Sequence, residues 1–558
     1  MKGKLMRKTT LFLATAGLML ALVAQTTAAP KPVAVVSFGG YDALKKDVAY
    51  AGQLGGNPDL AVGMEAMLKM FTGGKGLVGI DHAKPWGGVI YLEGEEPTGC
   101  AFIPVTNFAA LQSVFEPFVG KPETTDSGLL KFKTDEGPLF AVEEGGWVFF
   151  AKQQSELKLR PKSPGKLLGP LNEQYDFAVQ VNVDALPDSL RQQFIAEMKR
   201  ESANELERKP HEDDVEFQLR TRIIKSIIRA VETITGDTEQ VTLGYTLDGD
   251  AERAFIEVAV SAKPNTKMAE QFAALADSRT RYSGFILPDA ALTARWSGQC
   301  VHVDAQNVTE MTAAIKTKLM EEIDAEDKSD EEKAFAKDLV SEALAIMEGT
   351  VASGKADGAV SVRLGPNAVT LVGAGFISDG KKLEGIVKRI KDVAASENPL
   401  VNEWVTIDAD RYKDVSLHMV SVPIPDDADD REKAVSLIGD SLDVVVGMGE
   451  ESIYVAAGRD AMKTLKQALA DSSDEAYRTV PPMQMSMALK PIAEFAAVVG
   501  DDEQERKHAK MIATFLEDVS GRDNVSMTAR PIKHGVSLRI EAEEGILRLL
   551  GKVGAMAN

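Results

Sequence analysis

A strand pattern that runs straight into a helix pattern occurs four times along this chain. The four segments are 33–54, 177–198, 294–319 and 483–500. In the second segment Val179, Val181 and Val183 recur with the period of two that is typical of a half-buried strand. Asp184 and Asp304 stand near the predicted helix starts, where short polar side chains cap free backbone amides.

A second amphipathic helix is predicted after each of these segments. The predicted ranges are 59–71, 215–235, 331–348 and 502–519. In the range 215–235, Phe217, Ile224 and Ile228 follow helical spacing and form one apolar stripe. The repeated unit is therefore a strand followed by two helices.

Hairpins with a helix after them form a second recurring pattern. They are predicted in 241–275, 359–390 and 525–553, with a shorter copy in 76–95. The strongest turn signal is Asp248-Gly249-Asp250 between two alternating runs, and another lies near His534-Gly535. These segments predict antiparallel pairing rather than the strict strand–helix alternation of a doubly wound parallel sheet.

A third pattern, a strand, an acidic turn and a second strand, occurs in 137–160 and again in 443–466. The series of patterns then reads the same way twice, which predicts an internal duplication. The predicted fold class is α+β, with duplicated strand–helix–hairpin units and antiparallel sheets that carry helices packed on one face. The predicted halves are 30–283 and 284–558, and the alternative is continuous α+β repetition without a domain break.

The N-terminus predicts export. Basic residues precede a 14-residue apolar run from Leu11 to Ala24, and small residues follow it. This is the pattern of a secretory signal peptide over residues 1–28, cleaved after Ala28 or Ala29, and its alternative is an uncleaved anchor. Sec-type export to the periplasm or the extracellular space is the expected localisation.

The net charge of the chain indicates which classes of partner are expected. The chain has 63 Lys and Arg against 84 Asp and Glu, a net charge of −21. Because phosphate binding requires a basic field, nucleic acid is not an expected partner. No other apolar run approaches about 18 residues, so no membrane span is expected after cleavage.

Catalytic motifs are nearly absent. Gly74-Lys75-Gly76-Leu77-Val78-Gly79 matches a dinucleotide-binding pattern in letters, but it follows a predicted helix and precedes a strand, the reverse of the required context. The histidines are scattered, with no two within five residues: His82, His211, His302, His418, His508 and His534. We therefore assign no catalytic, cofactor-binding or metal-binding residue, and no cofactor. A site assembled from distant residues stays open.

Three further residue types are interpreted structurally. The acidic residues of 321–332 and the cluster Asp426, Asp427, Asp429 and Asp430 are predicted to be solvated loops, because calcium loops need a central Gly and fixed ligand spacing. Trp86, Trp147, Trp296 and Trp404 are predicted to pack in the core, with a ligand platform as the alternative. Cys100 and Cys300 are predicted to be buried thiols that do not pair.

The stretches SFGGYDALKKDVAYAGQLGGNPDL (37–60) and VQVNVDALPDSLRQQF (179–194), with the repeated layout, resemble large exported proteins of unknown function from planctomycete-type bacteria. The resemblance implies an export and envelope setting, and it brings no activity and no site residues. The leading hypothesis is a non-catalytic exported binding or structural protein of the bacterial envelope. The alternatives are a divergent hydrolase and a periplasmic carrier of apolar ligands, which would need a large apolar cavity.

Overall fold

The computed structural model describes residues 31–556 except 94–95, 210–211, 213, 367, 428–429, 475–477, 501 and 518–521. The predicted signal peptide at 1–28, His211 and Asp429 lie outside the described residues. The contacts divide the chain into two compact units. Unit 1 comprises residues 1–201, 231–263 and 541–558, and unit 2 comprises residues 202–230 and 264–540.

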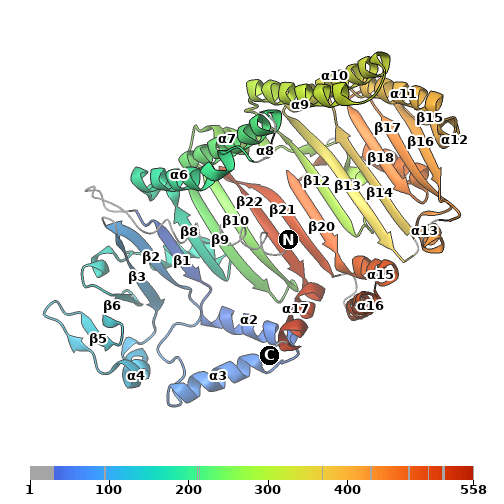
Figure 1. Cartoon of the computed structure of the whole chain (residues 1–558). Coiled ribbons are helices and arrows are strands. Elements are labelled where there is room, and N and C mark those ends of the chain that lie inside the picture. Colours follow the sequence, from blue (N-terminus) through green and yellow to red (C-terminus); the bar gives the residue numbers. More distant parts are fainter. Residues whose placement is uncertain are drawn as a thin grey trace. The chain divides into compact units, whose positions relative to one another are not determined.

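The fold is α+β and antiparallel, as the sequence predicts, and its elements are labelled in Figure 1. The strands of unit 1 are β1 (Ala34–Phe38), β2 (Trp86–Glu93), β3 (Glu96–Pro104), β4 (Glu123–Thr124), β5 (Leu130–Thr134), β6 (Gly137–Glu144), β7 (Trp147–Ala151), β8 (Phe177–Asn182), β9 (Thr238–Asp248) and β10 (Arg253–Ala262). They pair in the order β4-β5-β6-β7-β3-β2-β1-β8-β9-β10.

The helices of unit 1 include the one predicted at 59–71. They are α2 (Tyr41–Leu54), α3 (Leu60–Phe71), α4 (Phe108–Val119), α5 (Pro164–Asn172) and α17 (Glu544–Met556), with 3₁₀ helices η1 (Glu156–Leu159) and η2 (Val183–Ala185). Helices α6 (Asp188–Ala203) and α7 (Asp214–Asp237) each contribute residues to both units. The core includes Phe102, whose ring contacts the rings of Trp147 and Phe149.

The strands of unit 2 also pair in antiparallel fashion. They are β12 (Leu292–Gln299), β13 (Lys355–Gly365), β14 (Ala368–Phe376), β15 (Val405–Tyr412), β16 (Val415–Pro423), β17 (Ser441–Met448), β18 (Ser452–Gly458), β20 (Met483–Ala488), β21 (Asn524–Ile532) and β22 (Gly535–Glu543), and the last residues of β22, from Glu541, are assigned to unit 1. From β21 the pairing order is β21-β20-β12-β13-β14-β18-β17-β16-β15. Two short strands, β11 (Arg279–Thr280) and β19 (Arg478–Thr479), pair separately.

The helices of unit 2 are α8 (Lys267–Leu275), α9 (Ala305–Ala325), α10 (Asp330–Ala352), α11 (Gly380–Glu397), α12 (Val401–Trp404), α13 (Arg431–Ile438), α14 (Ala461–Asp474), α15 (Leu489–Val499) and α16 (Glu503–Glu517), with 3₁₀ helices η3 (Asn204–Leu206) and η4 (Ser283–Phe285). Among the residues that the structure describes, no helix combines the length and the apolar character that crossing a membrane requires.

Two helices, α17 and α8, belong to units that their positions in the sequence do not indicate. Helix α17, at the C-terminal end of the chain, belongs to unit 1 and contacts α2 and β10. Helix α8, which follows the β9–β10 hairpin, belongs to unit 2 and contacts β12 and β21. The predicted boundary between residues 283 and 284 stays a prediction, because these contacts group the chain into units and not into repeats.

Two sequence-based interpretations need correction. The acidic stretch 321–332 is not wholly a loop, because α9 continues to Ala325 and α10 begins at Asp330, so that only residues 326–329 connect the two helices. The acidic side chains of this stretch are exposed to solvent, as predicted, and Glu332 also caps the start of α10 together with Ser329. Cys300 is exposed, so the prediction of two buried thiols is wrong for it, whereas Cys100 is buried in β3 and both thiols are free.

Candidate functional site

One face of the unit 2 sheet is apolar and partly exposed. Strand register assigns side chains to the two faces, because residues paired across antiparallel strands point to the same side. A first row of paired residues crosses seven strands and consists of Met485, Ala294, Val360, Gly373, Val455, Val446 and His418. A parallel row consists of Met487, Leu292, Val362, Leu371, Ala457, Val444 and Val420. We call this the open face.

Exposure distinguishes the open face from the opposite face. On the open face Met485 is 43% exposed and Trp296 is 42% exposed. On the opposite face Ala359, Val372 and Ala456 are buried in a core that includes residues of α14 and η4. The open face is therefore a large apolar surface that remains accessible in the described structure.

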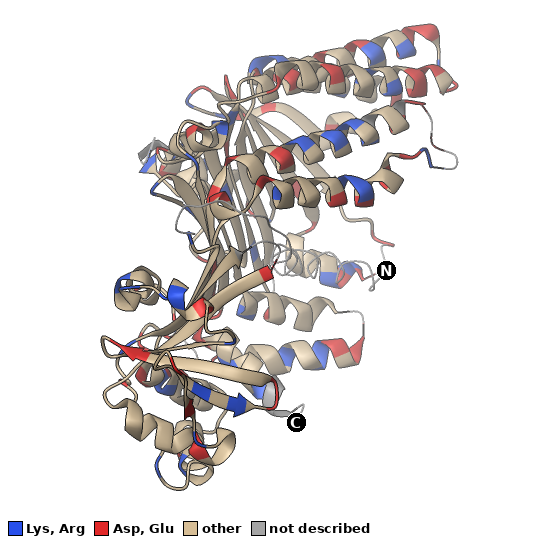
Figure 2. Ribbon diagram, turned by 90° about the vertical axis from the view of Figure 1, so that its left-hand side faces the viewer, with Lys and Arg blue, Asp and Glu red and all other residues tan. Residues whose placement is uncertain are grey.

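The helices next to the open face lie along the ends of its strands. In Figure 1, α9, α10 and α11 lie along one end of the unit 2 strands and α15 and α16 along the other, and the strands between them are not crossed by a helix. Figure 2 shows that blue and red residues concentrate on helices, whereas the strands are largely tan. The charge of this acidic protein thus lies mainly outside the open face.

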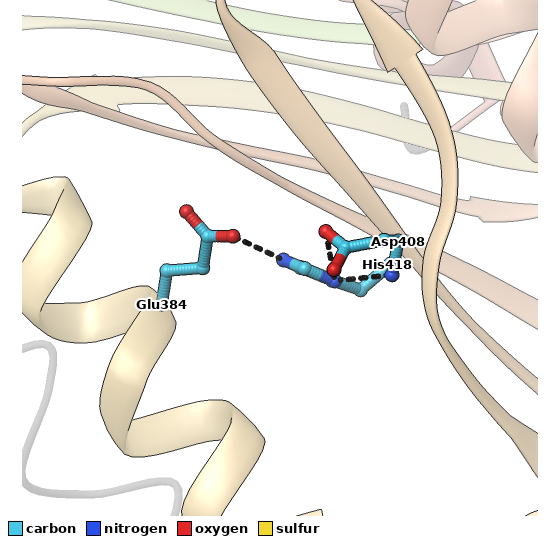
Figure 3. Close-up of side chains that lie close together, drawn as sticks. All are labelled: Glu384, Asp408 and His418. Carbon is cyan, nitrogen blue, oxygen red and sulfur yellow. Dashed lines mark hydrogen bonds and ion pairs between the residues drawn. The ribbon is translucent and has the colours of Figure 1, made fainter.

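The first row ends at a polar cluster of Glu384, Asp408 and His418 (Figure 3). Strand β16 supplies His418, and α11, which contacts β17, supplies Glu384. Asp408 lies where the β15–β16 register shifts, with a φ of 52°, a conformation that Asp adopts more readily than most residues. The bulge turns the Asp408 backbone amide toward the ring of His418.

The hydrogen bonds fix the state of the His418 ring. The Asp408 backbone N–H donates to His418 Nδ1 over 3.0 Å. Burial lowers the pKa of His418, although the Asp408 and Glu384 carboxylates oppose the shift, so the ring is neutral and carries its proton on Nε2. His418 Nε2 has no hydrogen-bond partner and lies 3.8 Å from Glu384 Oε1.

Two lysines neutralise the carboxylates of the cluster. Lys388 Nζ lies 2.8 Å from Glu384 Oε1 and 3.0 Å from Asp408 Oδ2, and Lys381 Nζ lies 3.2 Å from Glu384 Oε2. Burial alone would raise the pKa of Glu384, but the hydrogen bonds from both lysines outweigh it and hold that pKa at about 2. The formal charges of these four side chains cancel.

This arrangement fits neither a metal site nor a general base. One donor atom from each of Glu384, Asp408 and His418 lies within 4.8 Å of the others, but the Lys388 ammonium already bridges the two carboxylates. To bind a metal ion or to act as a base, the His418 ring would need a nitrogen with a free lone pair. Here Nδ1 accepts a hydrogen bond from the Asp408 backbone N–H, and Nε2 carries the ring hydrogen.

No residue of this region was predicted to form a site. His418 was interpreted as one of several scattered histidines, and Trp296 as a core residue. Trp86, Trp147 and Trp296 do lie in strands and Trp404 lies beside one, but the prediction of core packing is wrong for Trp296. The one available signal was the strict alternation in Met483-Gln484-Met485-Ser486-Met487, which indicates two unlike faces.

The remaining histidines are dispersed in the described part of the chain. His82 contacts the Leu77 carbonyl oxygen and the Tyr41 ring, and His302 pairs with Glu270. His508 lies on α16 and His534 lies in the turn between β21 and β22. The Gly74–Gly79 stretch lies between α3 and β2, the context expected for a connecting loop.

The comparisons with known proteins add little. No family model matches the chain, and no curated protein matches it. One solved structure, crystal form IV of TP0453, is similar to this chain with a TM-score of 0.21 and 8% identity, over 42% of this chain and 77% of that chain. A likeness at this level carries no argument about function.

Proposed function

We propose that the protein is an exported binding protein without a catalytic site, and that it binds apolar molecules on the open face of unit 2. The observation that carries the proposal is the exposure of Met485 and Trp296 on this apolar sheet face. Burying such a surface on binding is favourable by about 25 cal/mol per Å² of apolar area. Methionine suits a variable apolar ligand, because its side chain is flexible and polarizable.

Of the two binding hypotheses, the carrier of apolar ligands is favoured over a purely structural role. A carrier was expected to need a large apolar cavity, but an open sheet face provides the same chemistry without one. The hydrolase hypothesis is not favoured, because the proposed state of His418 provides no free lone pair to act as a base.

Export and duplication belong to the same proposal. Export rests on the predicted signal peptide at residues 1–28 and on the resemblance to exported proteins. Edman sequencing of the protein from the envelope fraction should begin at Ala29 or Pro30, and a retained Met1 would contradict cleavage. Duplication is supported by the strand orders, in which β8-β1-β2-β3-β7 and β20-β12-β13-β14-β18 occupy equivalent positions.

The binding proposal is tested with a fluorescent apolar dye, N-phenyl-1-naphthylamine, titrated into the full-length secreted protein. Met485→Lys introduces a charge into the open face and should weaken dye binding at least tenfold. Met511→Lys is the matched control, because Met511 is 61% exposed on α16 and does not belong to the rows of the open face. Equal dye binding by all three proteins, or none by the unmodified protein, would contradict the proposal.

A further inference from the structure

A cavity of about 230 Å³ lies in unit 2, where β12 ends and β13 begins. Ser297 on β12 and Asp357 on β13 are paired, and both line this cavity. Asp357 is two residues from Ala359, which is buried in the core, so the cavity lies on the covered face of the sheet. The chain between α8 and η4 supplies another wall. A ligand in this cavity would therefore not contact the open face.

The wall between α8 and η4 is held in place by Asp357. Thr280 Oγ1 donates to Asp357 Oδ1 over 2.7 Å, and the Arg281 backbone N–H donates to Asp357 Oδ2 over 2.9 Å. Next to them, Tyr282 is 1% exposed, and its hydroxyl shares a hydrogen bond with Ser452 over 2.8 Å. Both oxygens of the Asp357 carboxylate thus already accept hydrogen bonds, and they fix the wall that carries Arg281 against the sheet.

Three cationic side chains line the cavity, those of Arg279, Arg281 and Lys355. Lys355 Nζ lies 4.9 Å from the centre of the Phe376 ring, and in the described part of the chain the one carboxylate within 4.0 Å of it is that of Glu451. Glu451 Oε2 is 3.8 Å from Lys355 Nζ and 3.7 Å from Arg281 Nη1. Glu451 therefore lies near both cations without accepting a hydrogen bond across either of these distances, which are too long.

The donors around the cavity favour an oxyanion as the ligand. Arg279 donates through Nε to Asp277 over 3.0 Å, which engages one of its five N–H groups. A guanidinium binds a carboxylate or a phosphate through two parallel N–H···O bonds, and an ammonium adds a point charge. An oxyanion between Arg281 and Lys355 would accept the hydrogen bonds that Glu451 is too distant to accept. A cation would instead meet three positive side chains.

We infer that this cavity binds a small molecule that carries a carboxylate or a phosphate, and that this oxyanion takes the place of Glu451 as the counter-ion of Arg281 and Lys355. At about 230 Å³ the cavity is smaller than the range of about 300–1,000 Å³ that is common for drug-sized ligands, which restricts the ligand to a small molecule. The ring of Phe376 gives the cavity an apolar wall for the carbon atoms of the ligand. The inference is independent of the proposed function, because it concerns the other face of the sheet and a charged ligand.

The test is isothermal titration calorimetry of citrate and of glycerol 3-phosphate into the full-length secreted protein, in chloride buffer of constant ionic strength. We expect at least one of them to bind with a stoichiometry of one, and the tighter of the two identifies the oxyanion as a carboxylate or a phosphate. Lys355→Met should weaken this binding about tenfold, because it removes a charge-assisted contact. Lys316→Met on α9 is the matched control, because Lys316 is exposed and lies outside the cavity, and it should leave the affinity unchanged.

Glu451 provides a second test with the opposite sign. If the ligand replaces Glu451 as the counter-ion, Glu451→Gln should strengthen binding about threefold or more, because it removes a carboxylate that competes for the same cations. Glu450→Gln removes the same charge from the exposed neighbouring residue, and it should change the affinity by less than about twofold.

Binding of neither citrate nor glycerol 3-phosphate would overturn the inference, and so would binding that Lys355→Met leaves unchanged. Neither result bears on the dye binding by which the open face is tested. Equal strengthening by Glu451→Gln and Glu450→Gln would show that net charge alone acts, which contradicts the exchange of counter-ions. Should Lys355→Met fail to fold by circular dichroism, the difference between the two glutamate variants decides the inference.

Discussion

Replacing Ile546 tests the assignment of the C-terminal helix to unit 1. Ile546 is 8% exposed on α17, a helix that contacts α2 and β10. Ile546→Ala removes three carbon atoms, and at about 0.8 kcal/mol for each buried carbon the transfer loss is about 2.4 kcal/mol. The cavity that remains adds to this loss, so we expect the free energy of unfolding of unit 1 to fall by about 3 kcal/mol.

The close approach of α17 to α2 limits relaxation around the cavity. A Cβ atom built at Gly551 would lie 2.8 Å from the Leu54 carbonyl oxygen, so the two backbones are nearly in contact. The helix cannot move inward to fill the space left by Ile546 without a clash of main-chain atoms. The loss of stability caused by Ile546→Ala should therefore be typical of a well-packed site and not lie at the lower limit seen for such substitutions.

Hydrogen–deuterium exchange with mass spectrometry, measured at increasing urea concentrations, reports the two units separately through their peptides. The free energy of unfolding measured from peptides of α2, β9 and β10 should fall by about 3 kcal/mol. The value measured from peptides of β12 to β14 should not change. Leu550→Ala is the control on the same helix, because Leu550 is 61% exposed, and it should change stability by about 0.5 kcal/mol or less. Equal destabilisation of both units, or of unit 2 alone, would refute the assignment.

Two further predictions concern ionisation and thiol access. Burial raises the pKa of Asp47 from its ordinary 3.8 to about 6, so ionising it disfavours the folded state, and stability should fall as the pH rises from about 4 through 6. Asp47→Asn should remove that loss. Urea unfolding at pH 4 and pH 7.5 would then show a higher midpoint for the variant than for the unmodified protein at pH 7.5 only. A lower midpoint for the variant at pH 7.5 would contradict the predicted direction of the pKa shift. Maleimide should label the exposed Cys300 rapidly in the folded protein, and Cys100 only after unfolding, because Cys100 is buried and burial raises its pKa to about 12. Equal labelling rates of the two thiols in the folded protein, measured by mass spectrometry, would contradict this difference.

Much of the fold is determined by local sequence and was predicted from it. The predicted segment 33–54 contains β1 and α2, and the Asp248-Gly249-Asp250 turn joins β9 to β10. Strand and helix periods and turn chemistry depend on a few neighbouring residues, so a single sequence reveals them. The α+β class and the antiparallel pairing follow from the same signals.

Which face of a strand is buried was decided only by the tertiary structure. In β20 the sequence alternates Met with Gln484 and Ser486, and burial of the methionines would be the ordinary expectation. The structure instead leaves Met485 exposed and places the polar residues on the covered side, where Gln484 accepts a hydrogen bond from Arg295. Alternation marks two faces, but which face is covered depends on segments that lie elsewhere in the chain.

The candidate site likewise consists of residues that lie far apart in the sequence. Glu384, Asp408 and His418 belong to a helix, a bulged strand and its partner strand, and no spacing in the sequence connects the helix to the strands. The tautomer of His418 is set by a backbone amide that only the bulge at Asp408 turns toward it. The sequence alone thus determined the elements, whereas packing determined the exposed face, the unit that α17 joins and the polar cluster at the end of the first row, because these depend on contacts between residues far apart in the chain.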